Sequence, residues 1–188
     1  MTPNNLTALI LAGGRSRRFG ADKSRHVVEG RAMIEYVAEA VAAVADTVLI
    51  SVGEEGAVEI PSIRQVVDRY EDAGPLAGLH AGLTAAETPW VLAVACDMPF
   101  LTSQVLQALA AARGPEAAAV VARTPDGRLH PLCACYHQNT LPLVEAHLDA
   151  RTLAMHALLD GLPYVKYVDL PAGPLRNVNR VSDLDRPA

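Results

Sequence analysis

Short apolar runs without a charged residue alternate along this chain with segments of helical periodicity. The runs Leu6–Ala12 and Trp90–Cys96 are almost entirely apolar, and neither carries a charge. Strands of this kind are typical of a parallel sheet that is covered by helices on both faces. In Ala32–Ala45, by contrast, apolar side chains recur every three or four residues, which predicts a helix with one buried face. The alternation therefore predicts an α/β fold with a mixed, mostly parallel sheet and helices on both faces.

The remaining segments follow the same pattern. Further strands are expected at Thr47–Val52, Arg64–Val67, Ala117–Ala122, Leu129–Tyr136 and Tyr164–Leu170. Further helices are expected at Leu76–Ala86, Ser103–Ala112, Asn139–Leu148 and Thr152–Leu159, with a short one near the C-terminus. The turn residues Thr124–Gly127 join two of these strands and predict a hairpin. At least one strand of the sheet should therefore be antiparallel.

Length, composition and charge exclude several broad classes of protein. At 188 residues the chain suits a single domain, expected to span residues 1–188, and a hydrophobic content of 51% excludes disorder. The net charge of −5 speaks against binding nucleic acid or anionic lipid through bulk charge. Three cysteines, an odd number, speak against a disulfide framework. Because no apolar stretch reaches the roughly 18 residues of a membrane span and no signal sequence is evident, we expect a soluble, cytoplasmic protein. The chain is long enough to be stable alone, and we expect a monomer.

A glycine-rich, strongly basic loop follows the first expected strand. After the pair Gly13-Gly14, positions 15–25 hold five of the 16 basic residues, among them Arg15 and Lys23. Glycines let a backbone approach a ligand closely and aim its N–H groups at anionic oxygens. In an acidic protein, such a cluster is most simply explained by a bound polyphosphate. The spacing fits neither a P-loop nor a dinucleotide fingerprint, and the alternative is an ordinary turn with solvated arginines.

Two aspartates and two asparagines are candidates for the same site. Asp97 directly follows the run Trp90–Cys96, where a carboxylate must be compensated, and a Mg²⁺ shared with nucleotide phosphates would do so. A helix cap or an ion pair with a loop arginine is the alternative. Asp68 could accept two hydrogen bonds from the N1–H and N2–H edge of guanine, or it could stabilise a turn. Asn177 and Asn179 lie on one side of an extended segment and could hold a polar ligand or satisfy a turn.

These motifs, in this order, resemble those of a known family. Residues 11–23, with the sequence LAGGRSRRFGADK, resemble the signature of the GT-A-like, Rossmann-related nucleotidyltransferases, which have the nucleotide-diphospho-sugar transferase-like fold. The segments 68–80 and 96–99, together with the Asn-Val-Asn triplet 177–179, resemble the molybdenum cofactor guanylyltransferases in particular. The resemblance runs from about residue 6 to residue 184, nearly the whole chain.

The resemblance implies an activity and a set of site residues. Enzymes of this family transfer GMP from GTP to the terminal phosphate of molybdopterin or Mo-molybdopterin, require Mg²⁺ and release pyrophosphate. Other proteins of molybdenum cofactor biosynthesis are then expected partners. By position, the GTP-binding residues would be Leu11, Ala12, Gly13, Gly14, Arg15, Ser16, Lys23, Ser51, Asp68, Gly78 and Asp97. Asp97 would also hold the Mg²⁺ and act in catalysis with Arg15 and Lys23. Asn177 and Asn179 would line the pterin side.

The sequence departs from the family pattern at two places and leaves other functions open. Ser51 stands where some members carry Asn near the base, and Arg180-Val181 replaces the usual Thr-Pro. The alternatives are cytidylyl transfer to molybdopterin, nucleotidyl transfer to another phosphorylated small molecule, and a nucleotide sensor without turnover. The segment Gly74–Gly78 and the first glycine pair favour guanine over cytosine, by comparison with the sister cytidylyltransferases. Because the attacking group is already a phosphate, catalysis is expected to rest on positioning and charge neutralisation.

Overall fold

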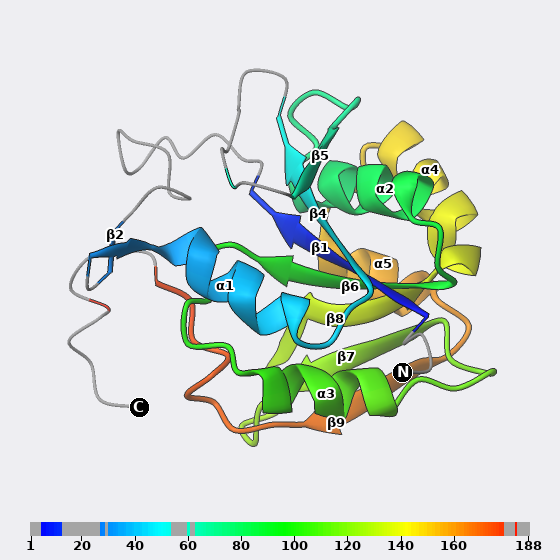
Figure 1. The fold of residues 1–188 in the computed structure, drawn as a ribbon. Helices are drawn as coiled ribbons and strands as arrows, with labels where there is room; N and C mark the ends of the chain where they lie inside the picture. Colours follow the sequence, from blue (N-terminus) through cyan, green and yellow to red (C-terminus); the bar gives the residue numbers. More distant parts are fainter. Residues whose placement is uncertain are drawn as a thin grey trace.

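The computed structural model describes residues 5–12, 27–28, 30–53, 60, 63–178 and 183. Within these ranges, seven strands form one sheet in the order β5-β4-β1-β6-β8-β7-β9 (Figure 1). Their bounds are Leu6–Leu11 (β1), Thr47–Val52 (β4), Arg64–Val67 (β5), Trp90–Ala95 (β6), Ala119–Arg123 (β7), Leu129–His137 (β8) and Val165–Asp169 (β9). A separate small ribbon pairs Val27–Val28 (β2) with Arg31–Ala32 (β3).

The large sheet is parallel except at one strand. β1 lies between β4 and β6 and is parallel to both, with Leu11 opposite Ser51 on one side and Ala95 on the other. β8 runs antiparallel to its neighbours β6 and β7, and β9 is parallel to β7. The predicted hairpin between β7 and β8 is therefore confirmed. Apart from β8, the strands of this sheet all end at the same side, which we call the carboxyl edge.

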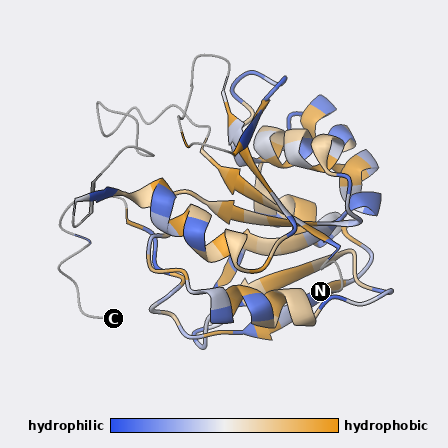
Figure 2. Ribbon diagram, in the orientation of Figure 1, coloured by the Kyte–Doolittle hydropathy of each residue, from blue (hydrophilic) through white to orange (hydrophobic). Residues whose placement is uncertain are grey.

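Helices cover both faces of the sheet, as the apolar strands predict. The helices are Met33–Ala42 (α1), Pro75–Ala85 (α2), Ser103–Ala111 (α3), Leu141–Asp149 (α4) and Met155–Gly161 (α5), with a 3₁₀ turn, Gln138–Thr140, before α4. On one face, α1 and α3 pack over a core that includes Ile10 and Leu92. On the other, α2, α4 and α5 pack over a core that includes Leu9 and Val91. Adjacent residues of one strand thus serve opposite cores, and the strands are orange through the middle of the molecule in Figure 2.

The boundaries of several elements differ from the predicted ones. α5 begins at Met155 rather than Thr152, because Arg151 has a positive φ of 55° and the Thr152 N–H donates back to His147 O at 2.9 Å. The β2–β3 ribbon was not predicted, since strands of two residues leave no periodic signal in a sequence. The short helix expected near the C-terminus falls beyond residue 178, largely outside the described residues.

Two negative expectations can be compared with the structure. The three cysteines are buried and none of them forms a disulfide. Among the described residues, no helix has both the length and the apolar character needed to cross a membrane.

Candidate functional site

The order of the strands reverses between β1 and β6. From β1 the chain runs outward through β4 and β5, and it then returns to the other side of β1 as β6. In open α/β sheets such a reversal leaves a crevice at the carboxyl ends of the two strands, and ligands bind there. Backbone hydrogen bonds join the strand ends at this point: Ala12 N–H donates to Ser51 O at 3.0 Å, and Cys96 N–H donates to Leu11 O at 3.2 Å. Ala12, the last described residue before the glycine loop, is therefore fixed at the crevice.

Asp97 lies at this reversal, two residues after the end of β6, and is partly buried. The Asn177 Nδ2 group donates to Asp97 Oδ1 at 2.7 Å. The next residue, Val178, donates its backbone N–H to the Asp97 carbonyl at 2.8 Å. The structure therefore brings together two of the predicted site residues that are 80 positions apart in the sequence.

Asp68 lies at the same edge, directly after β5, and is also partly buried. Its backbone N–H donates to Val52 O at 3.0 Å, and its carboxylate accepts a short hydrogen bond from the Ser51 hydroxyl. Burial raises the pKa of Asp68, while the Ser51 hydrogen bond and the nearby charge of His80 act in the opposite direction. The predicted guanine-side residues Ser51 and Asp68 are thus a hydrogen-bonded pair.

The helix α2 approaches these strand ends closely because of its glycines. Gly74, just before the helix, has φ 61° and ψ −147°, a conformation that side chains disfavour, and Pro75 suits the first helical position. A Cβ atom at Gly78 would lie 2.6 Å from Leu11 Cδ2 and 2.6 Å from Ser51 Oγ. Gly78 therefore has a packing role at the predicted site, and its contact with a nucleotide stays a prediction.

His80 also belongs to this region, although its residue type and position alone predict no role for it. Its side chain is buried, with Nε2 3.4 Å from Glu145 Oε1 of α4. Its ring meets the Tyr70 ring edge to face, with 5.1 Å between centroids. A histidine within the otherwise apolar and small residues of α2 carries no spacing signal, so only the fold connects it with the Asp68 segment.

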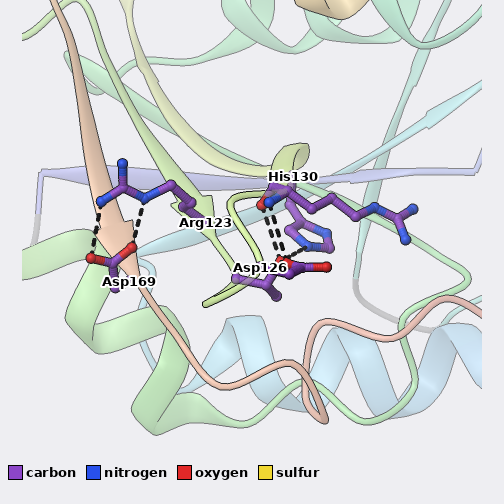
Figure 3. A network of polar contacts seen from close by, with 6 residues as sticks. Arg123, Asp126, His130 and Asp169 are labelled. Carbon is purple, nitrogen blue, oxygen red and sulfur yellow. Dashed lines mark hydrogen bonds and ion pairs between the residues drawn. The ribbon is translucent and has the colours of Figure 1, made fainter.

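A second polar cluster lies at the other end of the carboxyl edge (Figure 3). Arg123 of β7 forms a two-point ion pair with Asp169 of β9, with N···O distances of 2.6 and 3.0 Å. In the β7–β8 turn, Thr124 donates to Asp126 at 2.5 Å and lies 3.5 Å from the buried His130, whose pKa burial lowers. A cavity of about 400 Å³ borders this cluster. Because its arginine and aspartate already neutralise each other, we interpret the cluster as a structural brace of the turn.

Asp97 could supply a carboxylate ligand to a divalent cation. Within the described part of the chain, no three His, Cys, Asp or Glu side chains gather as a metal cluster. Mg²⁺ is usually held by one or two carboxylates together with phosphate oxygens and water, whereas structural zinc needs a closed set of protein ligands. The Asp97 carboxylate at the crevice is a ligand of the first kind.

Several predicted site residues lie outside the described residues. They are Gly13, Gly14, Arg15, Ser16, Lys23 and Asn179. The described members of the predicted site share the carboxyl edge or the helix packed against it; they are Leu11, Ala12, Ser51, Asp68, Gly78, Asp97 and Asn177.

Comparison with known proteins decides the family. A family model described as MobA-like NTP transferase domain matches residues 8–163. The chain belongs to this family. It is 37% identical over 179 residues to a probable molybdenum cofactor guanylyltransferase of Deinococcus radiodurans, with 95% of this chain and 92% of that protein covered. A probable molybdenum cofactor guanylyltransferase of Bacillus licheniformis is 31% identical over 188 residues, covering 94% and 93%. The family resemblance found in the sequence is confirmed.

Solved structures that superpose on this MobA-like chain confirm its fold. A molybdopterin-guanine dinucleotide biosynthesis protein A from Archaeoglobus fulgidus superposes with a TM-score of 0.80 at 23% identity, covering 95% of this chain and 94% of that one. A 2-C-methyl-D-erythritol 4-phosphate cytidylyltransferase from Thermus thermophilus gives 0.71 at 23% identity, with 95% and 94% covered. Since two proteins with such different names share this architecture, the fold by itself does not select the base.

Proposed function

We propose that this protein transfers GMP from GTP to the terminal phosphate of molybdopterin or Mo-molybdopterin, in the cytoplasm. An oxygen of the acceptor phosphate attacks the α-phosphorus of GTP, the bond from that phosphorus to the bridging oxygen breaks, and pyrophosphate leaves. The products are the molybdopterin guanine dinucleotide and pyrophosphate. The proposal is supported by membership of the MobA-like family and by relatives named molybdenum cofactor guanylyltransferase.

The observation that carries the proposal is the position of Asp97. Asp97 stands at the strand reversal, directly after Cys96, whose N–H donates to Leu11 O, and the basic glycine loop follows Ala12 in the sequence. A Mg²⁺ held there would neutralise phosphate charge on the substrate. From the glycine loop, Arg15 and Lys23 are proposed to stabilise the charge of the transition state and of the leaving pyrophosphate. The incoming phosphate is already an anion, so this chain needs to orient it rather than deprotonate it.

The guanine base is assigned to the opposite side of the crevice, at Asp68. An ionised carboxylate can accept both the N1–H and the N2–H hydrogens of guanine, whereas cytosine offers no such pair of donors. Ser51 already donates to Asp68 and so helps to keep the carboxylate oriented and ionised. Asn179 is proposed to line the pterin side, as the sequence resemblance implies.

Pyrophosphate release tests the proposed function directly. Purified protein is incubated with Mg²⁺ and molybdopterin, and with GTP, CTP or ATP in parallel. We expect pyrophosphate release with GTP and none with CTP or ATP. Release with CTP alone would assign the chain to cytidylyl transfer, and GTP binding without release would support a sensor. The variant Asp97→Asn should lower release by on the order of 10²-fold or more. The control Asp160→Asn, at an exposed aspartate on α5, should leave it unchanged.

A further inference from the structure

The contact between Asn177 and Asp97 joins the segment after the last strand to the loop after β6, in the middle of the chain. Asn177 lies after the last strand, in the segment that returns from β9 to the crevice, and its amide donates to Asp97 Oδ1 at 2.7 Å. By sequence resemblance this asparagine was expected on the pterin side. In the structure its amide N–H instead points at the carboxylate that is proposed to hold Mg²⁺.

The segment that carries Asn177 is fixed by several independent contacts. Leu175 and Val178 are each only 1% exposed, so the residues on both sides of Asn177 are anchored in the protein. The Val178 N–H donates to the Asp97 carbonyl at 2.8 Å. The Arg176 guanidinium lies 4.4 Å from the centre of the Phe100 ring, three residues beyond Asp97. The segment and the loop after β6 therefore form one unit, within which the orientation of the Asn177 amide is set.

An amide suits the role of orienting a metal-binding carboxylate. A neutral N–H donor fixes one carboxylate oxygen and favours its ionised form without cancelling its charge, as a lysine or arginine would. Groups that hydrogen-bond to metal ligands in this way fix the ligand's orientation and tune its affinity for the metal. The 2.7 Å distance to Oδ1 is short, as expected for a hydrogen bond to a charged acceptor.

We infer that Asn177 is a positioning residue that orients the Asp97 carboxylate for a divalent cation, rather than a contact to the pterin. The inference rests on the proposed function for the identity of the metal-binding carboxylate. It predicts that Asn177 acts on metal affinity and on turnover, and that it leaves the affinity for the acceptor unchanged.

Binding of Mn²⁺ by the protein in the presence of GTP, without the acceptor, gives a readout that needs no turnover. Electron paramagnetic resonance of free Mn²⁺ measures the dissociation constant for wild type, Asn177→Ala and the exposed control Asp160→Asn. Loss of an outer hydrogen-bond partner typically weakens metal affinity by about 10- to 100-fold. We expect Asn177→Ala to fall in this range and Asp160→Asn to match wild type.

Kinetics with Mg²⁺ and molybdopterin separate the two roles of Asn177. Asn177→Ala should lower kcat and raise the Mg²⁺ concentration needed for half-maximal rate, with the KM for molybdopterin within about twofold of wild type. An increased KM with unchanged metal affinity would overturn the inference and return Asn177 to the pterin side. If wild type releases no pyrophosphate, the proposed function fails, while the Mn²⁺ measurement still decides the role of Asn177.

Two further variants keep the test valid if Asn177→Ala unfolds. Asn177→Asp places a second carboxylate against Asp97 in place of the donor, and the repulsion should change metal binding more than the alanine does. Asn177→Gln retains the amide one methylene further out and should recover part of the affinity. Equal Mn²⁺ affinity in wild type, Asn177→Asp and Asn177→Gln would contradict the inference.

Discussion

The two aspartates at the carboxyl edge have similar surroundings, but their hydrogen-bond donors lie at very different distances along the sequence. Asp68 and Asp97 each follow a strand, each is partly buried, and each accepts a hydrogen bond from a neutral side chain. For Asp68 the donor is Ser51, 17 positions away on the adjacent strand β4. For Asp97 the donor is Asn177, 80 positions away and beyond the last strand. The proposed base side of the site is thus local in sequence, whereas the proposed metal side depends on the complete sheet.

Because of this difference, substitutions near the two aspartates should affect the enzyme in different ways. A change near Ser51 or Asp68 alters a small unit formed by β4, β5 and α2, and it should act first on the choice of base. A change near Asp97 or Asn177 alters a contact that exists only when β7, β8 and β9 have returned the chain to the crevice. It should act first on turnover.

The largest effect is expected at Asp97. Asp97→Asn is nearly isosteric, and its side-chain oxygen can still accept from Asn177, so the fold should be retained. Without the negative charge, the proposed metal position is lost. Removal of one preorganised charge of this kind typically costs on the order of 10²-fold or more in turnover. Steady-state pyrophosphate release, with Asp160→Asn as the matched control, measures it. Full Mg²⁺-dependent turnover in Asp97→Asn would show that this carboxylate does not hold the metal.

The next effect concerns the choice of base at Asp68. Asp68→Asn replaces one acceptor oxygen by an N–H₂ donor, which faces the N2–H₂ group of guanine unfavourably. A hydrogen bond to a charged group contributes about 1.5–3 kcal/mol, so the Kd for GTP should rise by roughly 10- to 150-fold. Xanthosine triphosphate carries an acceptor oxygen in place of that amino group and should bind the variant relatively better. Calorimetric titration with both nucleotides tests this, and an unchanged GTP affinity would remove Asp68 from the base site.

A smaller, structural effect is expected at Gly78. A Cβ atom there would approach both Ser51 Oγ and Leu11 Cδ2 to 2.6 Å, so the helix or the strand ends must shift. Overpacking of this kind typically costs about 1–3 kcal/mol, of which the better helix propensity of alanine offsets about 1 kcal/mol. Denaturant unfolding of Gly78→Ala should show the remaining loss, while Gly114→Ala, where a Cβ meets nothing within 4 Å, serves as the control. Equal unfolding midpoints would mean that the site accommodates the methyl group freely.

The comparison between the two aspartates also shows what a sequence can and cannot predict. Both carboxylates were identified because each follows an apolar or β-branched run, and strand ends in α/β sheets share an edge. The pairing of Asn177 with Asp97 could not be identified, because no spacing rule relates residues that meet only after seven strands have assembled. His80 was missed for a similar reason: its partner Glu145 lies on another helix. Gly78 was assigned to nucleotide binding by resemblance, and its packing against Ser51 became visible only in the structure.

The smallest effect concerns Ser51 and the pH dependence of GTP binding. Burial raises the pKa of Asp68, so its carboxylate takes up a proton at a higher pH than an ordinary aspartate does. Only the ionised form accepts both guanine hydrogens, so GTP affinity should weaken as the pH falls through this raised pKa. The Ser51 hydrogen bond opposes the rise, and Ser51→Ala should therefore move the loss of affinity to higher pH. At neutral pH the variant should lose about 1 kcal/mol of binding free energy or less.

The contribution of Asp68 to the free energy of unfolding should change with pH in the opposite direction to the GTP affinity. A raised pKa in the folded protein means that the fold binds this proton more tightly than the unfolded chain does. The resulting stabilisation is present at low pH and is lost as the pH rises through the folded-state pKa. The charge of His80, which also lowers the pKa of Asp68, is common to both proteins, so the difference between Ser51→Ala and wild type isolates the serine. Superimposable pH profiles for the two proteins would mean that the Ser51 hydroxyl does not stabilise the ionised Asp68 carboxylate. The Ser51–Asp68 and Asn177–Asp97 pairs would then resemble each other in geometry alone.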